Sequence, residues 1–166
     1  MNETIQLKNA QIRIAFLEEL KRARDDAAHR SQRALEIGVL ADGANQSKSD
    51  TTKHQLGLEQ DAAIETFRSI DFFLSNADKE LPSPPNRENV AIGSAIVLDS
   101  TLQEARETYF IVPRFGGITF AVDGLAIQTL SIDSPLGSRI MGKQVGWTII
   151  NDLGDEQETT SLIEII

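Results

Sequence analysis

The chain has 166 residues, which suffices for one large domain or two small ones. Its formal net charge of -9 argues against non-specific binding to nucleic acid or to an anionic membrane surface. It contains no cysteine, which excludes disulfides and thiolate metal sites, and its two histidines are too few for a histidine-based zinc site. The N-terminus lacks a signal pattern and no apolar run approaches the ~18 residues of a membrane span, so we expect a cytoplasmic protein without a membrane partner.

The first predicted element is a long helix from about residue 5 to residue 40. This segment contains no proline and one glycine, Gly38. Its apolar residues recur mostly at steps of three and four, the spacing of one helix face. They are Ile12, Phe16, Leu20, Ala23, Ala27, Ala34 and Ile37. A helix of this length is expected to need a partner, because most helical stability in proteins comes from packing.

The partner is predicted to be a second helix that follows a polar break. Residues 41–50 are small, polar and glycine-containing, which is typical of a loop, and Ser49 or Asp50 is suited to cap the next helix. From residue 51 to about 77 the helical periodicity returns, with Phe67 and Phe72 expected to join Phe16 at the packed base. Two helices joined by a short loop predict an antiparallel hairpin of the coiled-coil type.

A change of composition follows this hairpin. Residues 79–89 contain Pro82, Pro84 and Pro85, which prevent helix and favour extended backbone, so this segment is interpreted as a linker. From Val90 onward apolar residues recur every second position, and Gly154-Asp155 marks a turn between the last two strands. The sequence therefore predicts an α+β chain: a helical coiled-coil hairpin over 1–78, a linker over 79–89, and a small antiparallel β domain with one short helix over 90–166.

The short helix is expected within residues 131–146. Asp133 and Ser134 are suited to cap a helix, and Pro135 then occupies its first position, where a missing N–H costs nothing. Gly142 supplies the stop, and Lys143 stands where a cation suits a helix C-terminus. This segment therefore predicts a capped turn, about two helical turns and a second turn.

The same segment resembles the C-terminal domain of the Gre family of transcript-cleavage factors. The matching residues are Ile132, Ser134-Pro135-Leu136-Gly137, Ile140, Gly142-Lys143 and Val145-Gly146. The resemblance implies an FKBP-like β domain that follows a long helical hairpin and docks on RNA polymerase at its secondary channel. It also implies that Asp133, Ser134 and Pro135 form the docking turn, although these residues are equally suited to serve only as the helix cap. No sequence-specific DNA binding is expected.

The resemblance gives the hairpin tip a role in catalysis by the polymerase. Gre factors present tip acids that help to hold the second Mg²⁺ of the polymerase, and Mg²⁺ prefers hard oxygen ligands. The corresponding segment of this chain offers Asp42, Asn45, Gln46, Lys48 and Asp50. Asp42 and Asp50 either replace the acidic pair or serve as caps and solubilising residues. The chain is thus expected not to be an enzyme: at most it stimulates cleavage by the polymerase, without a cofactor of its own and with any Mg²⁺ shared.

A basic stretch on the first helix allows two interpretations. Its members are Lys21, Arg22, Arg24, Arg30 and Arg33. The resemblance makes them a surface near the nascent RNA, whereas the acids between them fit a solvated helix face. For the whole chain we expect a Gre-like transcription elongation regulator that binds RNA polymerase, without strong stimulation of cleavage. The alternatives are a coiled-coil adaptor with an unrelated partner and an FKBP-type prolyl isomerase.

Overall fold

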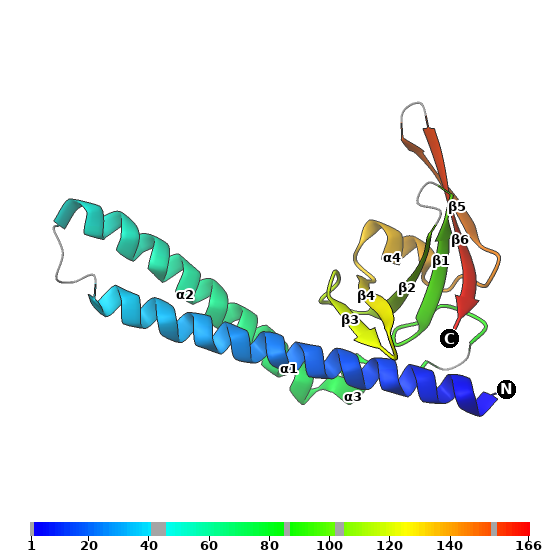
Figure 1. The fold of residues 1–166 in the computed structure, drawn as a ribbon, viewed down its shortest axis with the longest axis horizontal. Helices are drawn as coiled ribbons and strands as arrows, with labels where there is room; N and C mark the ends of the chain where they lie inside the picture. The colour runs from blue at the N-terminus through cyan, green and yellow to red at the C-terminus, as the bar shows by residue number, and fades with distance from the viewer. Residues whose placement is uncertain (1, 41–45, 85–86, 102–104, 154–155) are drawn as a thin grey trace. The chain divides into compact units, whose positions relative to one another are not determined.

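The computed structural model describes the backbone of residues 2–40, 46–84, 87–101, 105–153 and 156–166, and the side chains of 9–37, 54–84, 87–101, 106–150 and 158–166. Three helices come first, α1 (Asn2–Leu40), α2 (Gln46–Ser75) and α3 (Ala77–Glu80) (Figure 1). The strands and the last helix follow in the order β1 (Ala95–Ser100), β2 (Ala105–Val112), β3 (Thr119–Val122), β4 (Leu125–Ser131), α4 (Pro135–Ile140), β5 (Thr148–Leu153) and β6 (Glu156–Ile165). The predicted α+β class, with long helices before a sheet that carries one short helix, is confirmed.

Contacts divide the chain into two compact units. Met1–Phe16 and Asp78–Ile166 form one, here called the sheet unit, and Leu17–Ala77 form the other, the helix unit. The first part of α1 thus packs with the sheet. The sequence predicts a helical domain over 1–78, a linker over 79–89 and a β domain over 90–166. That these two domains fold independently stays a prediction.

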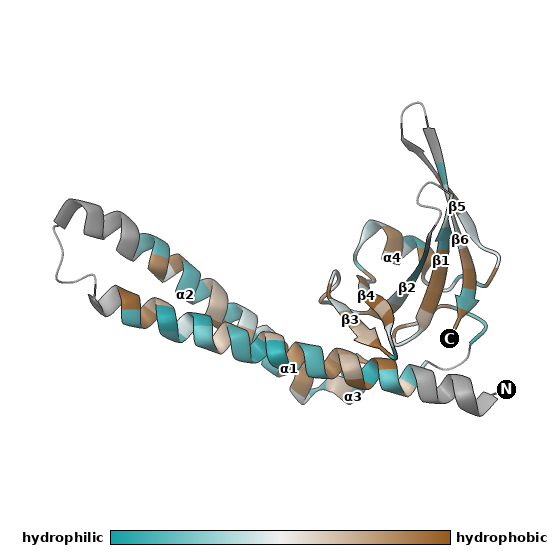
Figure 2. Cartoon of the chain, viewed as in Figure 1, coloured by the Kyte–Doolittle hydropathy of each residue, from teal (hydrophilic) through white to brown (hydrophobic). Residues whose placement is uncertain are grey.

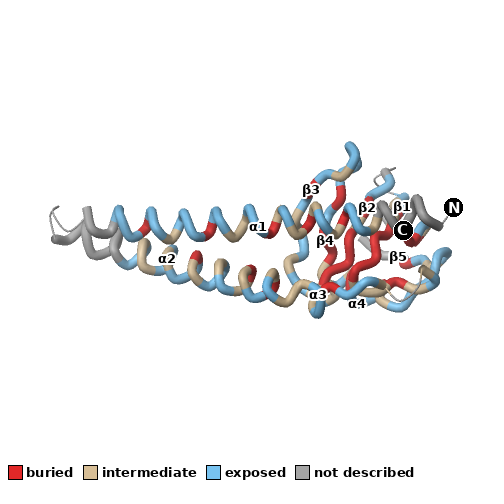
Figure 3. Tube along the Cα trace, turned by 90° about the horizontal axis from the view of Figure 1, so that it is seen from below, coloured by how far each residue is buried: buried red, intermediate tan, exposed pale blue. Residues whose placement is uncertain are grey.

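The helix unit has a coiled-coil seam. On α1, Leu20, Ala27 and Ala34 are buried at intervals of seven residues, and on α2 Ala63 and Ile70 repeat that interval. A seven-residue spacing keeps one stripe of each helix facing the other. Figure 3 shows buried positions, in red, recurring along α1 and α2. None of the described helices is long and apolar enough to cross a membrane.

Two expectations about α2 are wrong. The helix begins at Gln46 and not near residue 51, so Ser49 and Asp50 lie inside it and do not cap it. The polar residues 46–50 have no helix-breaking glycine or proline, so the helix extends through them. At the base, Phe72 has 56% of its surface exposed while the neighbouring Phe73 is fully buried. The buried stripe of α2 contains Ala63, Ile70 and Phe73, so Phe72 lies outside it and is exposed.

The six strands of the sheet unit lie in the order β3-β4-β2-β1-β6-β5. All neighbouring strands are antiparallel except β2 and β4, which pair in parallel from Thr108↔Ile127 to Val112↔Ser131. The expectation of a wholly antiparallel sheet is wrong for that pair. The reason is the tight hairpin that β3 and β4 form through Asp123 and Gly124, both at positive φ. Because of this hairpin, β4 lies next to β2 and runs in the same direction.

The core of the sheet unit lies between the sheet and α4. Ile96, Leu98, Ile111, Leu162 and, from α4, Ile140 are buried together there. Figure 2 shows hydrophobic residues concentrated on β1, whereas hydrophobic and hydrophilic residues alternate along α1.

Residues in and directly after the predicted linker also take part in packing. Leu81 is fully buried, and the Val90 amide donates to the Lys143 carbonyl at 2.8 Å while the Gly142 amide donates to the Val90 carbonyl at 2.9 Å. These bonds fasten the approach to the sheet against the turn that follows α4.

Candidate functional site: the capped turn and the cavity beside it

The turn before α4 is held by the hydroxyl of Ser134. This residue is the N-cap, with extended backbone at φ -72° and ψ 156°. Its Oγ accepts a hydrogen bond from the Gly137 amide at 3.0 Å and donates to the Ser131 carbonyl at 2.7 Å. Pro135 follows at the first helical position, as predicted, where its ring already has helical φ. The cap therefore fixes the direction in which the turn leaves β4.

Gly137 lets α4 approach the end of β4. A Cβ atom at this position would lie 1.9 Å from the Ser131 carbonyl oxygen, well inside van der Waals contact. After the other end of α4, Gly142 has a left-handed backbone conformation with φ 72°. The Lys143 amide then donates a hydrogen bond to the Ile140 carbonyl. The glycines of this segment thus have definite steric roles.

The three residues of the predicted docking turn differ in what they offer. Asp133 and Pro135 are exposed, whereas Ser134 is half-buried and its hydroxyl is engaged in the cap. Of the two predicted cap residues, Ser134 alone is the N-cap; the Asp133 amide donates to the Ser131 Oγ at 3.3 Å. The cap interpretation is confirmed for Ser134, and docking stays a prediction.

A cavity of about 250 Å³ opens beside Pro135, between α4 and the sheet. Its walls combine aliphatic side chains, among them Leu98, Leu136 and Ile149, with polar groups of neighbouring strands. Every second residue of a strand faces the same side of a sheet, so Glu107 and Tyr109 of β2 enter it together. Ser100 of β1 and Glu158 and Thr160 of β6 complete its floor, and Arg139 of α4 lines its rim.

The polar groups of this cavity are bonded to one another. The Tyr109 hydroxyl donates to Glu107 Oε2 at 2.5 Å, and the Ser100 hydroxyl donates to Glu158 Oε1 at 2.7 Å. Burial raises the pKa of the Tyr109 phenol well above its ordinary value, and the hydrogen bond to Glu107 and the charges of Glu107 and Glu158 raise it further. Two carboxylates therefore act on one phenol. This cluster was not foreseen from the sequence, although the spacing of Glu107 and Tyr109 was a signal that they share one face.

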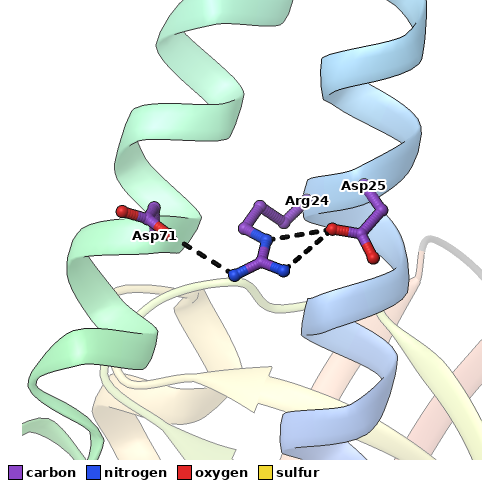
Figure 4. Close-up of polar contacts among 3 residues, drawn as sticks. All are labelled: Arg24, Asp25 and Asp71. Atoms are coloured by element: carbon purple, nitrogen blue, oxygen red, sulfur yellow. Dashed lines mark hydrogen bonds and ion pairs between the residues drawn. The ribbon is translucent and has the colours of Figure 1, made fainter.

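The predicted basic stretch on α1 is divided among separate contacts. Arg24 contacts Asp25 at 2.9 Å and, across the helix unit, Asp71 at 3.5 Å (Figure 4). The hydrogen bond to Asp25, together with the charge of Asp71, raises the pKa of the Arg24 guanidinium. Arg22 pairs with Glu19 at 3.0 Å.

The remaining basic residues of the stretch have other surroundings. Arg30 and Arg33 line a groove of about 430 Å³ between the helices, and Lys21 is exposed. Neighbouring acids thus offset part of the stretch, and contact with RNA stays a prediction.

The residues predicted at the hairpin tip lie at the margin of what the structure describes. Asp42 and Asn45 lie outside the described residues. Gln46, Lys48 and Asp50 belong to the start of α2, and their side chains also lie outside the described set. Among the described residues no group of three acidic or histidine side chains is arranged to hold a metal ion.

Comparison with known proteins finds similarity among solved structures. The transcription factor Gfh1 aligns over 91% of this chain and 93% of its own, with 18% identity and a TM-score of 0.37. GreA factor homolog 1 of Thermus thermophilus aligns over 90% and 94%, also with 18% identity and a TM-score of 0.37, and Gfh1 of Thermus aquaticus over 89% and 92%, with 19% identity and a TM-score of 0.35. No protein-family model and no curated protein matches the chain. TM-scores below 0.5 do not establish a common fold, so functional inference has to start from the residues of this chain.

Proposed function

We propose that this chain is a Gre-like transcription regulator that binds RNA polymerase through its secondary channel. The observation that carries the proposal is the segment from Ile132 to Gly146, which resembles the corresponding segment of the Gre family at the residues named in the sequence analysis. Its glycines and its serine fix the backbone of the turn.

The proposed docking element is the turn itself. Because the Ser134 hydroxyl is engaged in the cap, the turn is ordered before any partner arrives, and little conformational entropy remains to be lost on binding. Asp133 and Pro135 are exposed on it and supply one carboxylate and one rigid ring for contact. Ser134 then acts by positioning these two neighbours.

The proposed role is regulatory. RNA cleavage on the polymerase requires carboxylate oxygens at the second Mg²⁺, and the chain has amides and a lysine among its tip residues, Asn45, Gln46 and Lys48. The factor would therefore occupy the channel without completing the metal site. In this proposal it has no cofactor of its own, and its contact with nascent RNA is indirect.

The test is the affinity of the full chain for core RNA polymerase. Replacing Asp133→Ala together with Pro135→Ala is expected to weaken binding by about tenfold or more, because central interface residues carry most of the binding energy. Asp99→Ala, which removes an exposed carboxylate of β1, is the matched control and should bind like the wild type.

The outcomes separate the candidate functions. Wild-type affinity in the double variant, with an unchanged circular dichroism spectrum, would remove the turn from the interface. A wild-type chain that does not bind polymerase would overturn the proposed function and leave the coiled-coil adaptor as the better explanation.

A further inference from the structure

The cavity between α4 and the sheet has the size and chemistry of a receptor for one side chain. Its volume of about 250 Å³ is below the ~300–1,000 Å³ of pockets that enclose a whole small-molecule ligand. Leu98, Leu136 and Ile149 supply apolar wall, and Glu107 and Glu158 bring carboxylates to the same space. An amphipathic side chain with an aliphatic stem and a charged head fits such a lining.

The charge of the cavity selects a cation. Glu107 and Glu158 contribute two negative charges, against one positive charge from Arg139 at the rim. Both carboxylates line the cavity beside Tyr109, whose hydroxyl donates to Glu107 Oε2; Glu107 is exposed and Glu158 is half-buried. The Tyr109 and Ser100 hydroxyls each engage one oxygen of these carboxylates, and a carboxylate can accept hydrogen bonds at both of its oxygens.

The position of the cavity indicates that its occupant belongs to a macromolecule. Pro135, an exposed residue of the capped turn, forms part of the lining, so a surface that contacts the turn also covers the opening. Among cationic side chains arginine fits best, since its planar guanidinium presents five N–H donors in a fixed geometry and is more weakly hydrated than an ammonium group.

We propose that this cavity receives one arginine side chain of the protein on which the capped turn docks. Under the proposed function, on which this identification of the partner rests, that protein is RNA polymerase. The guanidinium bonds to Glu107 and Glu158, and the aliphatic stem lies against Leu136 and Ile149.

The first experiment tests the cavity without a partner. N-acetyl-L-arginine amide is titrated into the full chain and followed by NMR, with the uncharged N-acetyl-L-citrulline amide in parallel. The arginine probe is expected to shift resonances of residues that line the cavity, Tyr109 and Leu136 among them, at millimolar concentration. The citrulline probe should leave them in place, and so should the arginine probe with the Glu107→Gln, Glu158→Gln double variant.

The second experiment measures binding to core RNA polymerase. The double variant is expected to bind on the order of tenfold more weakly than the wild type and with less dependence on salt, because a charge-assisted contact is lost. Glutamine keeps the side-chain shape and can still accept the Ser100 hydrogen bond, so the fold should be retained. Glu164→Gln, on β6 but outside the cavity lining, is the matched control and should bind normally.

Each outcome decides between the two proposals. Wild-type binding by the double variant overturns the arginine receptor and leaves the proposed function intact. Failure of the wild-type chain to bind polymerase overturns the proposed function, and the NMR titration then decides alone. A shift confined to the cavity and abolished by the double variant supports the receptor, whereas no arginine-specific shift overturns it.

Discussion

The surroundings of Tyr109 differ clearly from those of a free tyrosine side chain in water. Burial raises the pKa of its phenol, and the hydrogen bond to Glu107 with the charges of Glu107 and Glu158 adds to the shift. It is also the only tyrosine of the chain, so ultraviolet absorbance of the phenolate reports on it alone. In the folded protein we expect ionisation well above the ordinary pKa near 10. Glu107→Gln should lower that pKa only in part, because burial, the largest cause, remains.

The same shift predicts how stability depends on pH. The folded chain retains the phenolic proton to higher pH than the unfolded chain, so this contribution to the free energy of unfolding is complete below pH ~10. It is lost as the pH rises from there toward the folded pKa. Urea denaturation across this range should show stability falling more steeply for the wild type than for Tyr109→Phe. Equal slopes for the two proteins would contradict the prediction.

Gly137 is predicted to be indispensable for steric reasons. Gly137→Ala would force a Cβ atom to within 1.9 Å of the Ser131 carbonyl oxygen, so α4 or the end of β4 has to move. We expect a loss of about 1–3 kcal/mol or more in the free energy of unfolding, the usual cost of overpacking. Chemical denaturation followed by Trp147 fluorescence measures it, because Trp147 packs against the same core.

A second glycine provides a control, because its replacement by alanine is expected to raise the free energy of unfolding and not to lower it. Gly57 lies inside α2 and a Cβ atom there would meet nothing within 4 Å. Gly57→Ala should therefore stabilise the helix unit by roughly 0.5–1 kcal/mol through helix propensity. A loss of stability on this change, measured by circular dichroism, would show that the space around Gly57 is not open.

At the scale of elements, the start of α1 is part of the sheet unit. Phe16 is fully buried, and its ring lies 5.6 Å from that of Phe110 and 6.1 Å from that of Phe120, the first of these edge to face. Phe16→Ala should reduce the free energy of unfolding of the sheet unit by about 3–5 kcal/mol. Ile14, on the same helix, has 58% of its surface exposed, and Ile14→Ala should change stability by less than ~0.5 kcal/mol. Comparable losses in both variants would refute the packing argument.

Helix periodicity and strand pairing differ in how far local sequence determines them. Of the apolar residues that spacing assigns to one face of α1, five are buried, namely Ile12, Phe16, Leu20, Ala27 and Ala34. The expectation is wrong for Ile37, which has 50% of its surface exposed, and Ala23 is half-buried. The parallel pairing of β2 with β4 depends on how the β3–β4 hairpin folds back, and no local pattern records it. The Asp123-Gly124 dipeptide is a local signal for that hairpin, because such pairs favour tight hairpin turns.

The candidate site shows the same limit. The capped turn could be predicted from sequence because a cap is local: serine, proline and glycine each serve a position within one turn. The cavity could not, because Glu107 and Glu158 lie on β2 and β6, which meet only through β1 between them. A carboxylate pair assembled from distant strands is visible only once the strand order is known.

At the scale of the whole molecule, the proposed function would give the tip and the sheet unit separate tasks on the polymerase. The turn and cavity of the sheet unit would supply affinity, and the hairpin tip would decide whether the polymerase cleaves RNA. A cleavage factor has to bring carboxylate oxygens to ~2.1 Å from the second Mg²⁺. In this chain the tip acids Asp42 and Asp50 stand apart in sequence, with amides and a lysine between them.

Asp42 and Asp50 are eight positions apart in the sequence, and Asp50 lies within α2, so they do not form the close carboxylate pair that a shared Mg²⁺ needs. We therefore expect the wild type to bind a stalled elongation complex yet stimulate little or no cleavage at physiological Mg²⁺, and Asp42→Ala and Asp50→Ala to behave like the wild type. Asn45→Asp with Lys48→Glu places two carboxylates three positions apart in the sequence and should increase cleavage without changing affinity. Strong wild-type stimulation that either alanine variant abolishes would instead assign the two aspartates to the metal site, and the chain would then be a cleavage factor with a rearranged tip.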